Sequence, residues 1–136
     1  MKQLSVYIEN QVGSMAKVTN MLKEAGISVK AISVFDSPDF SILRFVVDDV
    51  KEAKDVLTSH KVAVRVTDVI AICLEDKTGS LDHFLQICTQ NEINIRYMYS
   101  FVYRGINNPL LVLSTNEPEQ AVRIFEENNI KMINSL

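Results

Sequence analysis

The sequence lacks several features that would place it in a specialised class of protein. It has only two cysteines, Cys73 and Cys88, which are too few for a disulfide framework and do not form a CxxC pair. No apolar run approaches the ~20 residues of a membrane-spanning helix. The first ten residues alternate and include Glu9, which is typical of a strand and not of a signal peptide. We therefore expect a soluble cytoplasmic protein with two free thiols and no membrane contact.

The chain also lacks clusters of basic and metal-binding residues. Its net charge is −3 and it contains no block of Lys or Arg, which argues against binding to nucleic acid. His60 and His83 are isolated, so no metal site and no other cofactor is expected. No Ser–His or Cys–His pairing can be assembled from them, and we therefore predict that the chain is not an enzyme.

Apolar residues make up 47% of the chain, enough for a packed core, and their spacing predicts regular elements. In the first half, alternation predicts strands at 4–8, 27–35, 40–47 and 62–66. Helical spacing predicts one helix at 14–25, capped by Ser14 and ended by Gly26, and a second that begins at Asp48 and Asp49. The second half repeats this order, with strands at 70–74, 93–103, 110–114 and 130–133 and helices at 81–91 and from 117.

A repeated turn shows that the two halves are equivalent. The segment 9–15 recurs at 75–81, with Glu, Gly and Ser identical and Gly79 lying 66 positions after Gly13. A predicted turn at 104–109 is about two residues longer than its partner in the first half. Later positions therefore match at a separation of 68 residues, as Ala53 and Ala121 do. We therefore predict an α+β fold of two ferredoxin-like βαββαβ units, 1–67 and 68–136, each an antiparallel sheet with helices on one face. Because almost no linker separates them, we expect a rigid pair.

Each repeated turn leads from a strand through a glycine into a helix. Such a helix start presents backbone N–H groups that can bind a carboxylate. Asn10 and Asp76, at the ends of the preceding strands, can offer oxygen atoms to an ammonium group. In the alternative interpretation, Gly13 and Gly79 only permit a tight turn, which Asn10 and Asp76 satisfy locally.

An aromatic row distinguishes the second half. Tyr97, Tyr99, Phe101 and Tyr103 alternate along one predicted strand and therefore share a face. We expect this row to pack in a core or an interface, although it is also suited to lining a pocket or stacking bases. RNA binding would require basic surroundings, and the chain as a whole is acidic.

The two turns carry a family resemblance. Asn10–Gly13 has the pattern N-x-x-G and Asp76–Gly79 the pattern D-x-x-G, each between a first strand and a first helix. Together with the segments 26–29 and 92–95, which are similar to the family's second strand, they resemble tandem ACT domains. The resemblance implies a non-catalytic, allosteric regulatory protein that binds a free amino acid, acts on a metabolic enzyme and forms a homodimer.

The resemblance also implies where the ligand lies, namely between units, held by the first turn of one and the second strand of the other. The implied ligand-binding residues are Asn10, Gln11, Val12, Gly13, Ser14, Met15, Ile32, Ser33, Asp76, Lys77, Thr78, Gly79, Ser80, Leu81, Met98 and Tyr99. Histidine, aromatic and branched-chain amino acids all remain open as ligands. The two sites are expected to differ in affinity, because Lys77 replaces Gln11 and because Val12 and Thr78 stand where many family members have proline.

Two alternatives remain open besides amino-acid sensing. One is a protein-interaction module that uses the aromatic row as its partner surface. The other is a small enzyme on the same fold. An enzyme similar to acylphosphatase would need an arginine in its first turn, and neither 9–15 nor 75–81 contains one.

Overall fold

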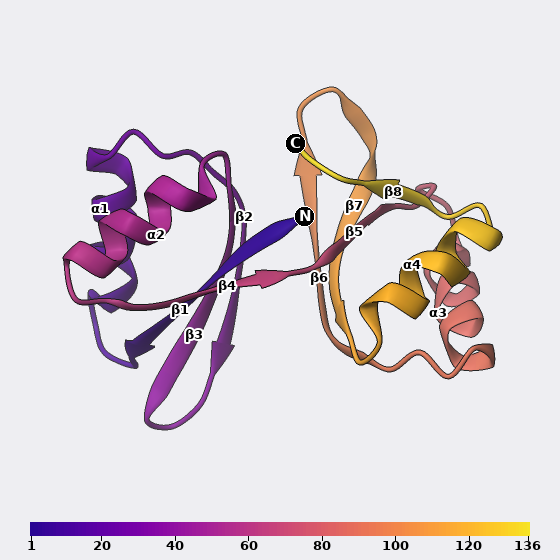
Figure 1. Cartoon of the computed structure of the whole chain (residues 1–136), viewed down its shortest axis with the longest axis horizontal. Helices are drawn as coiled ribbons and strands as arrows, with labels where there is room; N and C mark the ends of the chain where they lie inside the picture. Colours follow the sequence, from indigo (N-terminus) through magenta and orange to yellow (C-terminus); the bar gives the residue numbers. More distant parts are fainter. The chain divides into compact units, whose positions relative to one another are not determined.

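The computed structural model describes residues 1–136 and divides into two compact units. One is Lys2–Thr67, and the other is Asp68–Leu136 together with Met1. Each unit has the element order β-α-β-β-α-β, with a four-stranded antiparallel sheet and two helices. Within each unit the two helices cover one face of the sheet (Figure 1). The predicted pair of ferredoxin-like units is confirmed.

The first unit buries the apolar positions that alternate along its central strands. Its elements are β1 (Lys2–Glu9), α1 (Ser14–Glu24), β2 (Val29–Asp36), β3 (Phe40–Val47), α2 (Val50–Ser59) and β4 (Ala63–Asp68). The strand order is β2-β3-β1-β4, which places β2 and β4 at the edges. Leu4 and Val6 of β1 pack with Phe45 of β3 against Leu22 of α1 and Leu57 of α2, all of them buried. The apolar face of the alternating strands and the apolar faces of the two helices therefore pack into one core.

The second unit repeats this plan with a more aromatic core. Its elements are β5 (Ile70–Cys73), α3 (Ser80–Gln90), β6 (Ile95–Tyr103), β7 (Ile106–Thr115), α4 (Pro118–Glu127) and β8 (Lys131–Ile133). The strand order is β6-β7-β5-β8. Phe84 of α3 and Phe125 of α4 are fully buried, and their ring centroids lie 5.1 Å apart with the planes tilted. This pair joins the two helices over Ile72 and Leu113 of the sheet.

The first helix of each unit ends in the same hydrogen-bonded motif. Gly26 has φ +71°, its N–H donates to the Lys23 carbonyl (2.9 Å), and the Ile27 N–H donates to the Leu22 carbonyl (2.9 Å). These two bonds form a Schellman motif, so the predicted helix stop at Gly26 is confirmed. In the second unit Glu92 occupies this position with φ +56°, a conformation that glycine adopts more readily.

The starts of the helices differ from prediction at one position and agree at another. Ser14 does not cap α1, because it is the first helical residue, while Gly13 precedes it in the left-handed conformation with no side-chain cap. The predicted cap is therefore wrong: the chain enters the helix through a glycine that has no side chain to donate or accept. At α2, by contrast, a carboxylate of Asp49 accepts from the Glu52 N–H (3.0 Å), which confirms the predicted acidic start.

The predicted long turn at 104–109 is also wrong. Only Arg104 and Gly105 lie outside the strands, and β7 begins at Ile106. Phe101 pairs with Leu110 whereas Tyr103 pairs with Ile106, so the additional residues form a bulge inside β7. This bulge accommodates Pro109, which cannot donate to a central ladder, while its carbonyl accepts from the Leu74 N–H (3.3 Å).

The aromatic row of the second unit lies on one face of β6, as predicted. All four of its side chains are half-buried. Met98, between Tyr97 and Tyr99, packs into the core on the other face. The row therefore belongs to the sheet face opposite the helices.

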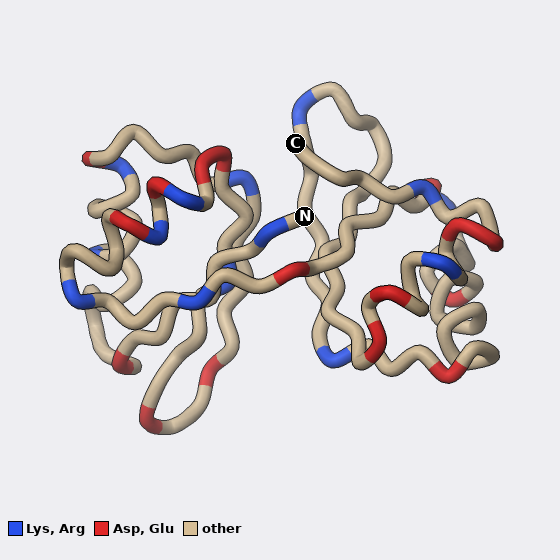
Figure 2. The backbone as a smooth tube through the Cα atoms, viewed as in Figure 1, with Lys and Arg blue, Asp and Glu red and all other residues tan.

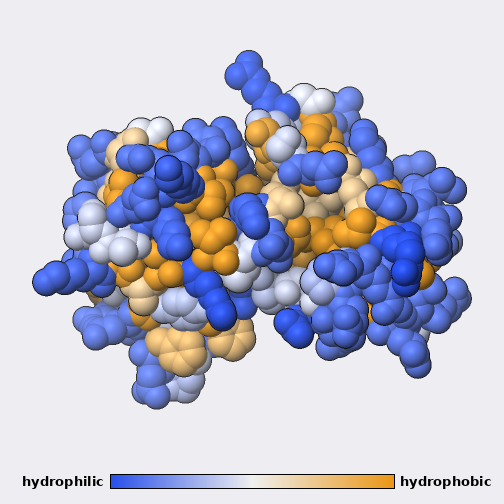
Figure 3. Space-filling model, viewed as in Figure 1, coloured by the Kyte–Doolittle hydropathy of each residue, from blue (hydrophilic) through white to orange (hydrophobic).

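Exposed apolar side chains concentrate on the β2–β3 hairpin of the first unit. Its exposed large apolar residues are Val29, Ile32, Val34, Phe35 and Phe40. Apolar surface is visible at the tip of this hairpin (Figure 3). Acidic and basic residues are interspersed along the backbone and form no continuous basic stretch (Figure 2). None of the four helices has the length and apolar character needed to cross a lipid bilayer.

Candidate functional site

The repeated turns have nearly the same backbone. Gly13 has φ 86° and ψ −7°, and Gly79 has φ 91° and ψ −11°. A Cβ added at either glycine would meet no atom within 4 Å. It is therefore the left-handed conformation, and not a lack of space, that favours glycine at both positions.

Each turn is closed by its own hydrogen bonds and leaves donors free at the helix start. The N–H of Ser14 donates to the Gln11 carbonyl and that of Ser80 to the Lys77 carbonyl, each at 3.2 Å. The serine N–H groups, which were predicted as ligand donors, are therefore used within the turn. Neither helix has a side-chain cap, and the next N–H groups, those of Met15 and Leu81, have no backbone acceptor. Each turn can thus still bind an anion at its helix start.

The side chains two residues before the glycines differ in charge. In the first turn the Gln11 amide donates to the Glu9 carboxylate. In the second, Lys77 Nζ lies 2.8 Å from Glu75 Oε2. The hydrogen bond from Lys77, assisted by its charge, lowers the pKa of Glu75 below the ordinary value, and Glu75 raises the pKa of Lys77 in return. Both side chains are exposed, so solvent screens this pair and it contributes little to stability.

Asn10 connects its turn to a distant hairpin. Its Nδ2 donates to Asp36 Oδ1 (2.8 Å) and to the Ser37 carbonyl (3.3 Å), 26 and 27 residues further along the chain. The alternative interpretation, in which Asn10 satisfies only its own turn, therefore does not hold for this side chain. Its amide nitrogen fixes the turn against the end of β2, which leaves the side-chain oxygen as the atom able to accept from a ligand.

A pocket of about 640 Å³ lies at the second turn. Four of the predicted residues line it: Lys77, Thr78, Gly79 and Ser80. The sequence did not single out the other lining residues as ligand contacts, and they come from four stretches of the unit: 73–75, 83–84, 108 and 128–131. These are Cys73, Leu74, Glu75, His83, Phe84, Asn108, Asn128, Asn129, Ile130 and Lys131.

The pocket combines several kinds of polar group with apolar side chains. Buried Phe84 is part of its lining, and so are Asn108, Asn128 and Asn129, whose side-chain amides can donate and accept. The Nδ2 of Asn128 already donates to the Ile124 carbonyl (2.8 Å). Lys77 and Lys131 supply positive charge, and Glu75 supplies a carboxylate. The structure contains no group of three His, Cys, Asp or Glu side chains arranged to hold a metal ion. The pocket is thus suited to a small polar molecule that carries groups of both signs.

Four predicted residues of the second unit do not line this pocket: Asp76, Leu81, Met98 and Tyr99. Met98 and Tyr99 belong to edge strand β6, and β7 separates that strand from β5, which leads into the turn. In the first unit Ile32 and Ser33 likewise belong to edge strand β2, with β3 between it and β1. Within each unit, therefore, the turn and the second strand lie at different parts of the sheet.

The two cysteines have different surroundings. Cys73 is half-buried and lines the pocket, whereas Cys88 is buried inside α3. Desolvation raises the pKa of the Cys88 thiol, which makes it less reactive. Cys73 is thus a natural chemical probe of the pocket.

Comparison with known proteins identifies the family. The family model of the ACT domain pair matches residues 1–135. The fold is similar to the crystal structure of protein BT0572 from Bacteroides thetaiotaomicron, with a TM-score of 0.91, 30% identity, and 97% of this chain and 90% of that chain covered.

More distant structures share the fold. The regulatory subunit of aspartate kinase from Thermus thermophilus in its ligand-free form has a TM-score of 0.62 and 20% identity, with 93% of this chain and 91% of that chain covered. The corresponding subunit from Thermus flavus has a TM-score of 0.61 and 20% identity, with 93% and 90% covered. No curated protein sequence matches the chain. On the strength of the family model and the 30% identical structure, the chain belongs to the ACT domain pair family.

Proposed function

We propose that the chain is a non-catalytic regulatory protein that binds a free amino acid at the turn of its second unit. The pocket at Lys77–Ser80 is the observation that carries this proposal. It joins an uncapped helix start, a lysine, a carboxylate and three asparagine amides in one place. An α-amino acid requires complements for one anionic and one cationic group, and this pocket offers both.

The chemistry assigns a role to each part of the pocket. The ligand carboxylate accepts from the free N–H groups at the start of α3 and from the Lys77 ammonium. The ligand ammonium donates to side-chain oxygens, of which Glu75 and the pocket asparagines are available. Binding at Lys77 competes with the Glu75–Lys77 ion pair, which is exposed and therefore weak. The turn of the first unit, with Gln11 in place of Lys77, is proposed as the weaker site.

The family and the fold support a regulatory role. The structures that share the fold include regulatory subunits of aspartate kinase, and we propose a metabolic enzyme as the target. We also propose a homodimer, because Ile32 and Val34 on edge strand β2 are 49% and 46% exposed. Sedimentation velocity tests the dimer. A monomer at all concentrations would contradict it, and Ile32→Ser should shift a real dimer towards monomer.

A thermal-shift screen against the twenty amino acids, followed by calorimetric titration, tests the ligand. We expect one or a few amino acids to raise Tm at millimolar concentration, by binding the folded state alone. Lys77→Gln, which copies the first turn, should weaken binding by about tenfold, the effect of losing one charged hydrogen bond. The matched change in the first unit, Gln11→Ala, should leave the stronger site unchanged.

Cysteine labelling shows where the ligand binds. Iodoacetamide should modify Cys73 at least about tenfold faster than buried Cys88, and the bound amino acid should slow only Cys73. If no amino acid shifts Tm, amino-acid sensing is wrong. If one binds but leaves Cys73 labelling and the Lys77→Gln affinity unchanged, the ligand lies elsewhere and the proposed pocket is wrong.

A further inference from the structure

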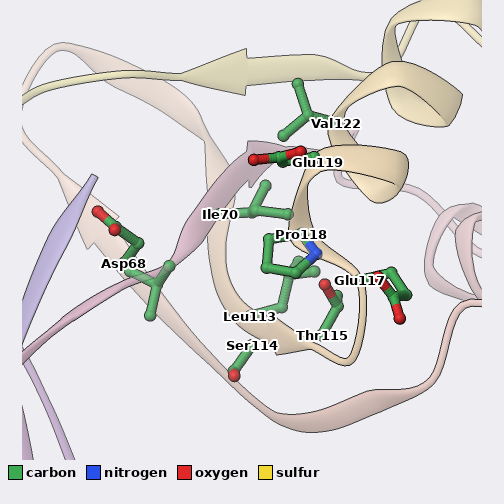
Figure 4. A pocket seen from close by; sticks show the side chains of 10 residues that line it. Asp68, Ile70, Leu113, Ser114, Thr115, Glu117, Pro118, Glu119 and Val122 are labelled. Atoms are coloured by element: carbon green, nitrogen blue, oxygen red, sulfur yellow. The ribbon is translucent and has the colours of Figure 1, made fainter.

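A second pocket in the same unit lies at the start of α4. It has a volume of about 560 Å³. It is formed where β5 begins and β7 ends, whereas the Gly79 turn follows the other end of β5. Its apolar lining includes Ile70, Leu113, Pro118 and Val122 (Figure 4). No residue lines both this pocket and the one at Lys77–Ser80.

Thr115 is the unusual residue of this pocket. The residue is only 3% exposed, and its hydroxyl has no hydrogen-bond partner in the protein. The hydroxyl points towards Pro118 at the start of α4, among the side chains that line the pocket (Figure 4). Burying a hydroxyl without a partner disfavours folding, so packing alone does not account for a threonine here.

The first unit has no hydroxyl at the matching position. Leu4 pairs with Phe45 in the first sheet, and the matching residue Ile70 pairs with Leu113 in the second. Phe45 therefore matches Leu113, and Thr115, two residues further along β7, matches Val47. Valine has nearly the shape of threonine and leaves no polar atom unsatisfied. The backbone therefore accepts an apolar residue at this place, and the hydroxyl is specific to the second unit.

The charges around the pocket also differ between the units. The acidic residues Asp68, Glu117 and Glu119 are among those that line the pocket, and no Lys, Arg or His lines it. At the positions matching Asp68 and Glu119 the first unit has Lys2 and Lys51. Acidic residues at a helix start are favoured by the helix dipole in any protein, so they alone would not indicate a ligand. Together with the unpartnered hydroxyl of Thr115, the Glu119 carboxylate supplies acceptor atoms beside the apolar lining.

We propose that this pocket binds a primary alkylammonium ion, that is, an amine with a short aliphatic body. The Glu119 carboxylate extends across the pocket between Ile70 and Val122 and accepts from the ammonium group (Figure 4). A second ammonium N–H donates to the Thr115 hydroxyl, which then gains the partner it lacks. The aliphatic body packs on the apolar lining. This site goes beyond the proposed amino-acid site and does not depend on it.

The test is a ¹H–¹⁵N NMR titration of the full chain with n-pentylammonium chloride. We expect saturable shifts of amides around Thr115–Glu119, and none with n-pentanol, which has the same body without the charge. Glu119→Gln should weaken the affinity by about tenfold and Thr115→Val by about threefold, since each removes one acceptor. Lys51→Gln, at the matched position of the first unit, should leave the affinity unchanged.

Three results would overturn the proposal. The first is the absence of saturable shifts with n-pentylammonium in the wild type. The second is equal affinity in the wild type, Glu119→Gln and Thr115→Val, and the third is an equal response to n-pentanol. Both variants are expected to fold, because Glu119 is exposed and valine occupies the position of Thr115 in the first unit; amide spectra without ligand check this. The NMR shifts around Thr115–Glu119 do not depend on whether an amino acid binds at Lys77, because the two pockets share no residue.

Discussion

The turns of the two units share a backbone but not a chemistry. Gly13 and Gly79 agree within a few degrees in φ and ψ, and both turns close with the same serine N–H bond. Two residues before the glycine, the first turn has a neutral glutamine paired with Glu9 and the second a lysine paired with Glu75. The backbone conformation depends on the glycine, so the side chain at this position can change without altering the turn. Two sites built from one duplicated motif can therefore differ in ligand preference.

The largest expected effect comes from changing the glycines themselves. Gly13→Val and Gly79→Val should each lower the free energy of unfolding by about 1–2 kcal/mol, because a β-branched residue disfavours a positive φ. Chemical denaturation followed by circular dichroism measures both. Because a Cβ meets no neighbour at either site, the two losses should be similar.

Ligand binding should separate these two variants. Gly79→Val should weaken amino-acid binding strongly, since a distorted turn misplaces the N–H groups at the start of α3, whereas Gly13→Val should leave the stronger site intact. The matched control is Gly105→Ala, at a third glycine with positive φ outside the pocket. Equal loss of binding in all three variants would indicate a general effect of instability.

A smaller effect is expected where the first helices end. Glu92→Gly should raise the free energy of unfolding by about 0.5–1 kcal/mol, because glycine removes the left-handed strain while adding disorder to the unfolded chain. This change copies Gly26 of the first unit, which has the same Schellman motif. The reverse change, Gly26→Glu, should lower stability by a similar amount in the same denaturation experiment. Destabilisation by Glu92→Gly would mean that the Glu92 side chain has a role of its own.

The smallest effect concerns pH. The pKa of Glu75 lies below its ordinary value of 4.5 because of Lys77, so the ion pair is present above that value and is lost as pH falls through the lowered pKa. Carboxyl NMR titration should show Glu75 with a lower pKa in the wild type than in Lys77→Gln. Acid stability of the two proteins should hardly differ, because the pair is exposed. An unchanged Glu75 pKa in the variant would show that the ion pair does not form in solution.

Hydrophobic periodicity and the internal repeat were sufficient to predict the fold. Alternation in β1 and β3 and helical stripes in α1 and α2 identify their own buried faces, and the second unit repeats them. The errors lie in segments whose composition is compatible with two different local structures. The segment Gly105–Pro109 has the residues of a turn, yet its last four residues lie in β7, because a bulge allows Pro109 to sit in a central strand.

The site was harder to predict than the fold. The glycine turn is a local signal, and four of its predicted residues line the pocket. Asn108, Asn128 and Asn129 were not predicted, because asparagine is common at helix ends and turns and only tertiary contact brings these three to the pocket. The partner of Asn10 was missed for the same reason, since it lies 26 residues away. A buried threonine such as Thr115 has no sequence signal that separates it from an ordinary strand residue.

The closure of the second turn by its own backbone has a consequence for the kinetics of the proposed ligand binding. The Lys77 N–H donates to the Glu75 carbonyl (2.9 Å) and the Ser80 N–H to the Lys77 carbonyl (3.2 Å) with no ligand required. A ligand therefore meets a loop that is already ordered, and little conformational entropy is lost when it binds. Association then does not wait for folding of the loop. At the proposed amino-acid site, occupancy would therefore respond to a rise in ligand concentration without a preceding folding step.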